Sequence, residues 1–552
     1  MIRDAGLRRV NLRTQVIEEF HPNAEVPESL VDPRVLGLYE DRQGKVWVAT
    51  FSGLERYDLA RNGFVHFQHD PSDRYSLGAN RVYSVFQDRD GAIWVGTYRG
   101  GVSRADPYNL KFEHYYYSLA NREGLPSNNV LAILEDSRGD LWVGTDTGGV
   151  SIYSRDTRRF TNMLWSSGWS IAAIAEDKNG RLWFGTQGAG LVSYDRSTKV
   201  VRQYWHQRNN ASSIGDNTVR SLYVDKSGTL WIGFSDKGLD RYDDRTDSFF
   251  HFWPDTEYVN VGVWCIYEDR RGVLWLGTIP GGPVYAFDQR TGVFTRPIRE
   301  INGSVRAIYE DPKGIFWFGS WSGGMYRFDP SSQTVTRFTE FDGLANDFVK
   351  GMLADEHENL WISTEKGLSK FSPETRTFKN FTTKDGLQSD FFWSRSFCKG
   401  RDGRMYFGGT NGFNVFHPDS IRDNPNVPPV VITRFTVLNE TVTLSRGGGV
   451  YNGVTLSHAQ NFFSFDFVGL NYTAPERNQY AHKMEGFDKD WVDAGTRRYV
   501  SYTHLDPGSY TFKVKASNND GVWNEQGTSL SIVILPPYWQ TWWFRLLAIV
   551  AL

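Results

Sequence analysis

A tryptophan recurs through most of the chain at spacings of 41 to 48 residues, each time in a short apolar run such as Leu-Trp-Val-Gly-Thr at residues 141–145. One apolar run precedes it and two follow it, and turns of the types Glu-Asp-x-x-Gly and Gly-Gly separate them. Asp and Gly suit tight turns, because Asp bonds nearby backbone and Gly accepts a positive φ. The repeated residues are Trp47, Trp94, Trp142, Trp183, Trp231, Trp275, Trp317 and Trp361, with Tyr406 in the ninth place.

Four short strands at this period are the pattern of a β-propeller blade. One such meander cannot bury both of its faces, so neighbouring repeats have to cover them. A Trp-rich β-solenoid is the alternative, but solenoid repeats are usually shorter and contain no four-stranded meander. The sequence therefore predicts an all-β chain built from propeller blades.

A break in the pattern predicts how the ring closes. After Asp106-Pro107 the segment Lys111–Tyr117 resembles a strand, and the last repeat has a third strand at Phe413–Phe416 but no fourth. We expect these two segments to pair and to close a seven-bladed β-propeller over residues 108–417, because closure leaves no open sheet edge. Residues 1–107 are then the C-terminal blades of a partial first propeller, and Met1 is expected to start a fragment in the middle of a blade.

The repeats end at a proline-rich linker, residues 418–429. Residues 430–537 alternate apolar and polar side chains, for example at Phe463, Phe465 and Phe467, which predicts an immunoglobulin-like β-sandwich. Residues 538–552 place aromatic side chains before an aliphatic run, as at the start of a transmembrane helix. This run is shorter than the about 20 residues that cross a bilayer, so the helix is predicted to be truncated. A final buried strand or a loose apolar tail is the alternative.

Charge and motif content argue against several functions. The net charge of −3, without basic or RNA-stacking motifs, argues against nucleic-acid binding. Cys265 and Cys398 fall in the first strands of blades three apart, which is too far for a disulfide. The eleven histidines are not at metal-ligand spacings, and no nucleophile-elbow, zinc-protease or phosphate-loop motif occurs, so no cofactor, metal or catalytic site is predicted. Glu-Asp pairs such as Glu135-Asp136 recur at one turn of blade after blade, which indicates turn capping rather than catalysis.

Two sets of motifs resemble known families. Residues 305–314 followed by Trp317-Phe318-Gly319, with lead-ins at residues 123–128 and 342–347, resemble two-component regulator propeller repeats. In the predicted sandwich, the motifs that resemble the triple-tyrosine (Y_Y_Y) domain are Asn478-x-Tyr480, Gly486-Phe487-Asp488-x-x-Trp491, Tyr502-x-x-Leu505-x-Pro507-Gly508-x-Tyr510 and Asn518-x-Asp520-Gly521-x-Trp523. The resemblance spans nearly the whole chain.

The resemblance implies the periplasmic, ligand-sensing region of a two-component sensor that is anchored in the inner membrane and forms a homodimer through the β-sandwich. In that family the output half is usually a histidine kinase, often in hybrid systems that detect glycan fragments, and in other members a diguanylate cyclase. This chain departs from the pattern, because it has nine repeats and a stub instead of two complete propellers, and no output domain. We expect it not to be an enzyme. A secreted propeller lectin or polysaccharide lyase is the alternative.

Aligning the first strands on their turns predicts where a ligand binds. The first strand of a blade is innermost, so the aligned position next to one face surrounds the mouth of the central channel. Its residues are Leu131, Ala172, Arg220, Trp264, Arg306, Lys350 and Arg395. Aligning the last repeat on Asp385-Gly386-Leu387 instead places Trp393 there, and Trp169 and Trp321 fall on the same face.

Four cations in seven places would repel one another unless carboxylates or an anionic ligand neutralise them. Arg binds carboxylate or sulfate through a planar fork, and indole rings suit the apolar faces of sugars. We therefore predict a small ligand, an acidic oligosaccharide with uronate or sulfate groups, bound by Arg220, Trp264, Arg306, Lys350, Arg395, Trp169, Trp321 and Trp393. The alternative is that each cation pairs with an acidic neighbour between blades and that the tryptophans pack between blades.

Overall fold

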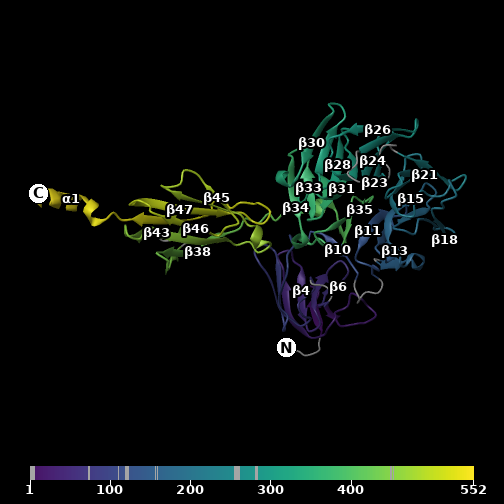
Figure 1. Ribbon diagram of the computed structural model, residues 1–552. Coiled ribbons are helices and arrows are strands. Elements are labelled where there is room, and N and C mark those ends of the chain that lie inside the picture. The colour runs from purple at the N-terminus through teal and green to yellow at the C-terminus, as the bar shows by residue number, and fades with distance from the viewer. Residues whose placement is uncertain are drawn as a thin grey trace. The chain divides into compact units, whose positions relative to one another are not determined.

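The structure is a computed structural model, and it describes residues 6–71, 75–109, 111–117, 124–155, 157, 159–253, 261–279, 284–447, 450–451 and 453–551 (Figure 1). Residues 118–123, which follow the predicted strand Lys111–Tyr117, and Leu552 lie outside the described residues. The chain divides into two compact units. One unit is Leu110–Ile421, and the other joins Met1–Asn109 to Arg422–Leu552.

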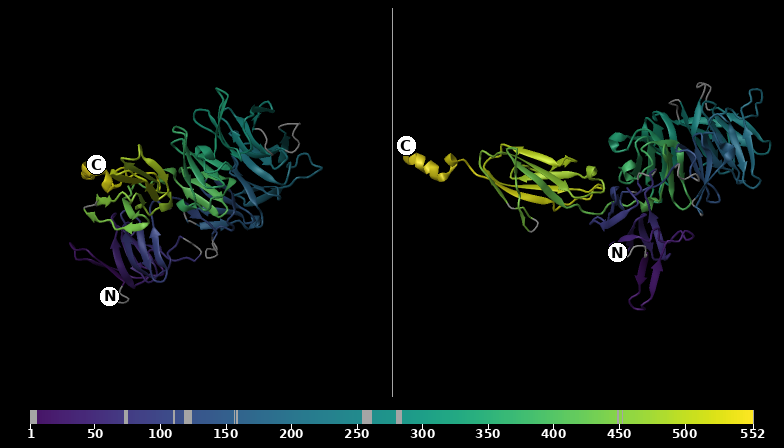
Figure 2. Two further views of the ribbon diagram at one scale, coloured as in Figure 1. Left: turned by 60° about the vertical axis from the view of Figure 1, so that its left-hand side comes forward. Right: turned by 90° about the horizontal axis from the view of Figure 1, so that it is seen from below.

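Within its described residues, the unit Leu110–Ile421 contains seven four-stranded antiparallel sheets (Figure 2). The first three are β11 (Val130–Glu135), β12 (Leu141–Thr145), β13 (Gly149–Ser154) and β14 (Arg159–Asn162); β15 (Ile171–Glu176), β16 (Leu182–Thr186), β17 (Leu191–Asp195) and β18 (Val200–Tyr204); and β19 (Val219–Val224), β20 (Leu230–Phe234), β21 (Leu239–Asp243) and β22 (Ser248–Phe252). The next three are β23 (Gly262–Glu268), β24 (Val273–Ile279), β25 (Val284–Asp288) and β26 (Val293–Ile298); β27 (Ser304–Glu310), β28 (Phe316–Trp321), β29 (Gly324–Asp329) and β30 (Thr334–Phe338); and β31 (Val349–Ala354), β32 (Leu360–Thr364), β33 (Leu368–Ser372) and β34 (Thr377–Phe381).

The seventh sheet joins the two ends of this unit. Its strands are β35 (Phe392–Lys399), β36 (Met405–Gly409), β37 (Gly412–Phe416) and β10 (Glu113–Tyr115). The strand β10 pairs antiparallel with β37, with Tyr115 opposite Phe413, and this is the pairing predicted from the sequence. First strands of successive sheets contact one another, and β35 also contacts β11. The seven sheets therefore follow one another around a ring, as in a propeller.

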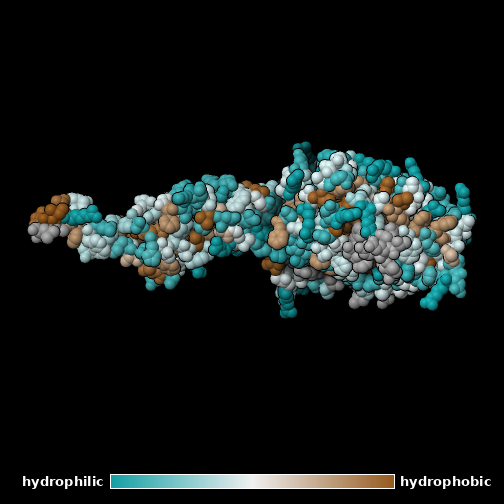
Figure 3. Space-filling model, turned by 45° about the horizontal axis from the view of Figure 1, so that its top comes forward, coloured by the Kyte–Doolittle hydropathy of each residue, from teal (hydrophilic) through white to brown (hydrophobic). Residues whose placement is uncertain are grey.

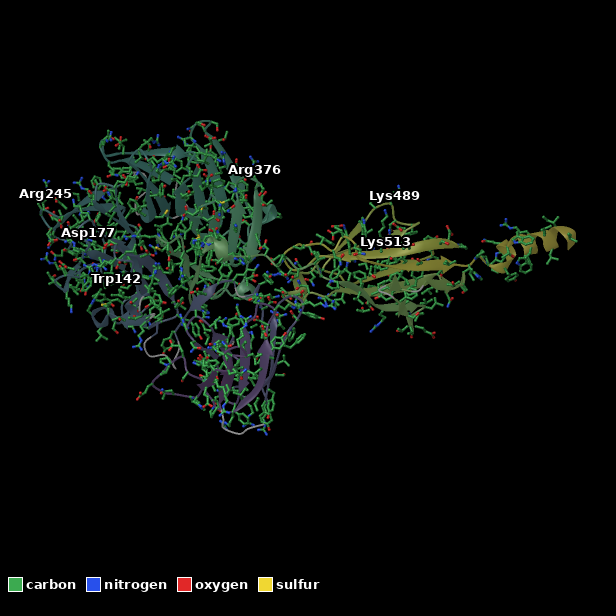
Figure 4. All side chains as sticks on the ribbon, turned by 180° about the vertical axis from the view of Figure 1, so that it is seen from behind. Trp142, Asp177, Arg245, Arg376, Lys489 and Lys513 are labelled. Atoms are coloured by element: carbon green, nitrogen blue, oxygen red, sulfur yellow. The ribbon has the colours of Figure 1, made fainter. Side chains whose placement is uncertain are left out.

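One hydrogen bond recurs in the repeats, between the indole N–H of the repeated tryptophan and the Asp of the Glu-Asp-x-x-Gly turn. In the third sheet Trp231 Nε1 donates to Asp225 Oδ2 at 2.8 Å, and the backbone N–H groups of Ser227 and Thr229 donate to Asp225 Oδ1 at 2.9 Å. The other pairs are Trp47–Asp41, Trp94–Asp88, Trp142–Asp136, Trp183–Asp177, Trp275–Asp269, Trp317–Asp311 and Trp361–Asp355 (Trp142 and Asp177 are labelled in Figure 4). The predicted capping role of the Asp is confirmed.

The Glu of the same turn links neighbouring sheets, because its carboxylate accepts a backbone N–H from the preceding sheet. The backbone N–H of Ser137 donates to Glu176 of the next sheet at 2.5 Å, and that of Lys226 donates to Glu268 at 2.8 Å. The same bond joins Arg270 to Glu310, and Arg401 to Glu135 where the ring closes. Val224, Ala354 and Lys399 take the place of Glu in the third, sixth and seventh sheets, so this glutamate link cannot form at three of the seven junctions.

Replacing Asp225 with alanine tests the Asp–Trp bond. The change leaves the buried Trp231 N–H and two turn N–H groups without their acceptor, and we expect the free energy of unfolding to fall by roughly 2–4 kcal/mol. Asp243→Ala, at an exposed turn of the same sheet where the carboxylate accepts the backbone N–H of Arg245, is the matched control. Urea unfolding followed by tryptophan fluorescence measures both, and equal losses in the two variants would contradict the assignment.

The first part of the other unit continues the repeat. It contains β1 (Leu7–Val10) and β2 (Ile17–Phe20) as a pair; β3 (Val35–Glu40), β4 (Val46–Thr50), β5 (Leu54–Asp58) and β6 (Gly63–Phe67) as a four-stranded sheet; and β7 (Val82–Gln87), β8 (Ile93–Thr97) and β9 (Gly101–Ala105) as a three-stranded sheet. The four- and three-stranded sheets have the same Trp–Asp bond as the ring, at Trp47 and Trp94.

The second part of that unit is a β-sandwich. One sheet has the order β39 (Glu440–Val442), β38 (Val430–Val437), β43 (Phe462–Gly469), β46 (Tyr499–Thr503). The other has the order β42 (Val454–Leu456), β48 (Thr528–Ile534), β47 (Gly508–Ala516), β44 (Tyr480–Glu485), β45 (Val492–Gly495), and β40 (Arg446–Gly447) pairs with β41 (Val450–Tyr451). The predicted alternation is present, because Phe463, Phe465 and Phe467 are all buried. The ring of Phe465 stacks on that of Phe512 in the second sheet, with the ring centroids 3.8 Å apart.

The C-terminal apolar run forms a helix, α1 (Trp542–Ala551), and not a buried strand. Its side chains are exposed: Trp542 is 75% and Val550 80% accessible to solvent, and the apolar residues are visible at the C-terminal end of the chain (Figure 3). No helix in the described part of the chain combines the length and the apolar content needed to cross a bilayer.

Removing residues 542–552 tests whether α1 belongs to the sandwich core. Since its apolar side chains are exposed, we expect the free energy of unfolding of the sandwich to change by no more than about 0.5 kcal/mol. Phe512→Ala, which empties the centre of the core, should cost about 3–5 kcal/mol in the same assay. A loss of several kcal/mol on truncation would mean that α1 is part of the core.

Candidate functional site

The first strand of every sheet in the ring breaks its pairing register near its beginning. In β11, Val130 pairs with Thr145 and Ala132 with Gly144, so Leu131 between them is left out of the ladder. The residues left out at this β-bulge in the next five sheets are Ala172, Arg220, Trp264, Arg306 and Lys350. A bulge re-aims the side chain that it releases from the ladder. The position that the sequence alignment selected is therefore a structural site repeated around the ring.

The seventh sheet has a wider break. Phe392 pairs with Gly409 and the next pair is Phe397 with Phe407, so residues 393–396 are out of register. Strand β35 has eight residues where β11 has six, and the two additional residues explain why two sequence registers were possible. Both Trp393 and Arg395 reach the same cavity, and Arg395 has a φ of +68°, a left-handed conformation that is uncommon for a non-glycine residue.

Except for Ala172, which is not among the lining residues, the released side chains line one cavity of about 740 Å³, which we call the cation–tryptophan cavity. Seven of the eight predicted site residues line it: Arg220, Trp264, Arg306, Trp321, Lys350, Trp393 and Arg395. The eighth, Trp169, is not among the lining residues, and its ring contacts the ring of Trp165 with centroids 6.2 Å apart. The cavity volume is in the range of small-molecule sites.

The alignment missed polar residues of the lining, among them Asp146, Gln187 and Ser394. Asp146 and Gln187 each follow directly after a second strand, the place that Trp321 takes within β28. Aligning second strands as well as first strands would have found them. Ser394 lies in the additional residues of β35, and no repeat pattern could have predicted it.

Three arginine side chains lie over the ring of Trp264. The guanidinium carbon of Arg306 lies 3.5 Å from the Trp264 ring centroid, that of Arg220 5.0 Å and that of Arg395 5.3 Å. Such contacts attract a cation to the negative face of the ring. Arg306 and Lys350 are also 4.9 and 5.5 Å from the ring of Trp321. Trp264 therefore holds the arginines together, and Trp321 and Trp393 are the indoles left to contact a ligand.

The predicted alternative, in which each cation pairs with a carboxylate, holds for one cation. Lys350 Nζ lies 2.6 Å from Glu365, and Arg220 Nε donates to the Ser235 hydroxyl at 2.7 Å. Among the residues that the structure describes, no ion pair joins Arg220, Arg306 or Arg395 to a carboxylate. The described lining of the cavity thus carries more positive than negative charge.

Burial lowers the pKa of the cationic side chains in the cavity. It lowers the pKa of Arg395 to about 9 and that of Arg306 to about 10, and the positive charge of Arg220 lowers both further. Burial also lowers the pKa of Lys350, against the opposing effect of Glu365. Cys265 supplies no compensating charge, because burial raises the pKa of its thiol to about 12. Arg306 and Arg395 therefore remain protonated at neutral pH, and a bound anion would stabilise their charged forms.

Arg306→Met tests whether the buried charge is uncompensated. Methionine keeps an apolar contact with Trp264 and removes an unpaired cation, so we expect the free energy of unfolding to rise by about 1 kcal/mol. Arg196→Met is the matched control, because buried Arg196 pairs with Asp136 at 2.5 Å and Glu176 at 2.8 Å, and breaking those pairs should cost about 3–5 kcal/mol. Destabilisation of similar size in both variants would show that Arg306 has a carboxylate partner.

Models of two families match the chain. The model described as two component regulator propeller matches residues 29–52, 76–99, 124–147, 165–188, 213–236, 258–279 and 300–322, and the model of the Y_Y_Y domain matches residues 471–535. The chain therefore carries two-component regulator propeller repeats followed by a Y_Y_Y domain, as its motifs indicate.

Similar proteins include histidine kinase P4 of Formosa agariphila, 30% identical over 212 residues, which are 37% of this chain and 15% of the kinase. Among solved structures, the extracellular domain attributed to a hybrid two-component system of B. thetaiotaomicron is 21% identical, with 97% of this chain and 89% of that chain covered and a TM-score of 0.37. A streptogramin B lyase is 12% identical, with 56% of this chain and 99% of that chain covered and a TM-score of 0.45.

Proposed function

We propose that this chain is the extracytoplasmic ligand-sensing region of a membrane-bound two-component sensor, and that it binds an acidic oligosaccharide in the cation–tryptophan cavity. The observation that carries the ligand class is the unpaired positive charge of Arg220, Arg306 and Arg395 inside the described part of a cavity of about 740 Å³. The repeats and the Y_Y_Y domain, found in a chain related in part to a histidine kinase, support the sensor role.

The remaining lining suits a sugar. Trp321 and Trp393 offer indole surface to the apolar face of a pyranose ring. Asp146 and Gln187 offer oxygen and nitrogen atoms for hydroxyl groups. Because the cations come from four different sheets, a ligand that reaches all of them has to span those sheets.

We further propose that binding is relayed through the β-sandwich of residues 430–537 to α1, the start of an inner-membrane helix, in a protein that dimerises through the sandwich. The exposed aromatic and aliphatic side chains of α1 support the anchor, since tryptophan and tyrosine prefer the membrane interface. A histidine kinase is the proposed output, and a diguanylate cyclase is the alternative within the same sensor architecture.

A secreted propeller lectin or polysaccharide lyase is the second candidate. A lyase requires a base that removes a proton and an acid that assists the leaving group. Asp146 is the carboxylate of the described lining, and it accepts a hydrogen bond from the Ser170 hydroxyl at 2.5 Å. Incubation with acidic polysaccharides that yields unsaturated products would favour the lyase.

Calorimetric titration with matched neutral and acidic oligosaccharides tests the ligand class. We expect the acidic ligand to bind more tightly, and the variant Arg220→Ala/Arg306→Ala to lose about tenfold or more of that affinity, because each substitution removes a charge-assisted contact. Arg196→Lys, outside the lining, is the control for general effects of the substitution. Tighter binding of the neutral ligand, or unchanged affinity in the double variant, would overturn the proposal.

A further inference from the structure

Several residues that line the cation–tryptophan cavity have buried hydrogen-bond donors without an acceptor. Within the described chain, ten buried side-chain nitrogen or oxygen atoms have no hydrogen-bond partner, and five of them belong to residues that line this cavity. These five atoms are Trp264 Nε1, Arg306 Nη1, Arg395 Nε, Arg395 Nη1 and Trp393 Nε1. Buried polar atoms are normally paired, because an unpaired one costs the free energy of its lost hydration. Half of the exceptions lie in one cavity, which marks it as a place where acceptors from outside the chain would be stabilised.

All five atoms are donors, and this restricts the chemistry of the group that satisfies them. Indole and guanidinium nitrogens donate and do not accept. A sugar hydroxyl or a protonated acid would bring a proton of its own, which needs an acceptor at the same place. An acceptor-only group, an anion without a proton, meets no such conflict.

The positions of the donors favour a tetrahedral anion over a planar one. The donors come from three strands of the ring, Trp264 from β23, Arg306 from β27, and Arg395 with Trp393 from β35. Arg306 and Arg395 both lie close to the ring of Trp264, at 3.5 and 5.3 Å from its centroid. A carboxylate presents two oxygens in one plane, whereas a sulfate ester presents three terminal oxygens in three directions. A sulfate ester also carries no proton at neutral or mildly acidic pH.

We infer that the cluster of Trp264, Arg306 and Arg395 binds a sulfate ester of the ligand, and that it discriminates sulfated from merely carboxylated sugars. This inference rests on the proposed function, since it assigns one group of the acidic oligosaccharide to one part of the cavity. Arg220 and Lys350 are the cations left for a second acidic group, and the ion pair of Lys350 with Glu365 makes Lys350 a weaker competitor for the sulfate. The arginines suit the sulfate because guanidinium groups bind such oxyanions through paired donors and are weakly hydrated.

The test compares a sulfated uronate tetrasaccharide with the same tetrasaccharide after desulfation, which keeps its uronates. Titration calorimetry of the chain should give at least about tenfold tighter binding of the sulfated form, the difference expected from one additional charge-assisted interaction. Trp264→Phe keeps the aromatic ring and removes one donor, and Arg395→Lys keeps the charge and removes the fork. Each should weaken binding of the sulfated ligand by about tenfold and that of the desulfated ligand by less than about threefold.

Trp165→Phe is the matched control, because Trp165 Nε1 is also buried and unpaired among the described residues but does not belong to the lining. It should leave both affinities unchanged, and thermal unfolding identifies any variant that fails to fold. Equal affinity for the two tetrasaccharides, or an equal loss for both in Trp264→Phe and Arg395→Lys, would overturn the sulfate assignment while leaving the acidic-ligand proposal intact. Absence of binding by both acidic tetrasaccharides would overturn both.

Discussion

The hydrogen bond between the repeated tryptophan and the turn aspartate is the interaction on which the ring depends. One carboxylate does two things: it accepts the N–H of the buried indole, and it accepts two backbone N–H groups that close the turn. The pKa of Asp41 shows the balance, since burial raises it but the Trp47 bond and the backbone N–H groups together keep it below its usual value. In the six sheets of the ring that have this bond, the first strand carries its bulge at the same position relative to the second strand.

The shared position of the bulge explains why the ring can carry a variable binding surface. At the bulge of each first strand the side chain leaves the ladder and takes no part in strand pairing, so its identity is free to change from Leu131 and Ala172 to Trp264 and the four cations. Elsewhere on the same strands the side chains are confined to the core, as at Val130, Val219 and Val263, which are completely buried. Stability and recognition thus reside in alternate positions of one strand, and the uncompensated charge of the cavity is tolerated because the core around it is complete.

The sequence was sufficient for the architecture because the tryptophan spacing fixes both the number of strands and their order. The same register also predicted most of the cavity, since Arg220, Arg306 and Lys350 fall at one repeated position. It failed at two places where the chain departs from the repeat: the two additional residues of β35 bring Ser394 into the lining, and the ring of Trp169 contacts Trp165 instead of the cavity. The inter-sheet bonds of Glu176 and Glu268 were also beyond prediction, because a turn motif specifies its own backbone but not the neighbour that its second carboxylate reaches.

The three junctions without the glutamate link give the ring an uneven mechanical compliance. At Val224 the neighbouring sheets are joined instead by Arg181 and Asp244 at 2.7 Å, at Ala354 by Lys313 and Glu358 at 3.7 Å, and at Lys399 by Lys399 itself and Glu356 at 2.6 Å. In each of these ion pairs at least one side chain is well exposed. Exposed ion pairs contribute little free energy, and salt weakens them further by screening the charges. These three joints divide the ring into an arc that holds Arg220, Trp264 and Arg306, a single sheet that holds Lys350, and an arc that holds Arg395. A molecule that contacts the cations of all three parts therefore braces the ring across these joints, and the stiffness of the ring then depends on its occupant.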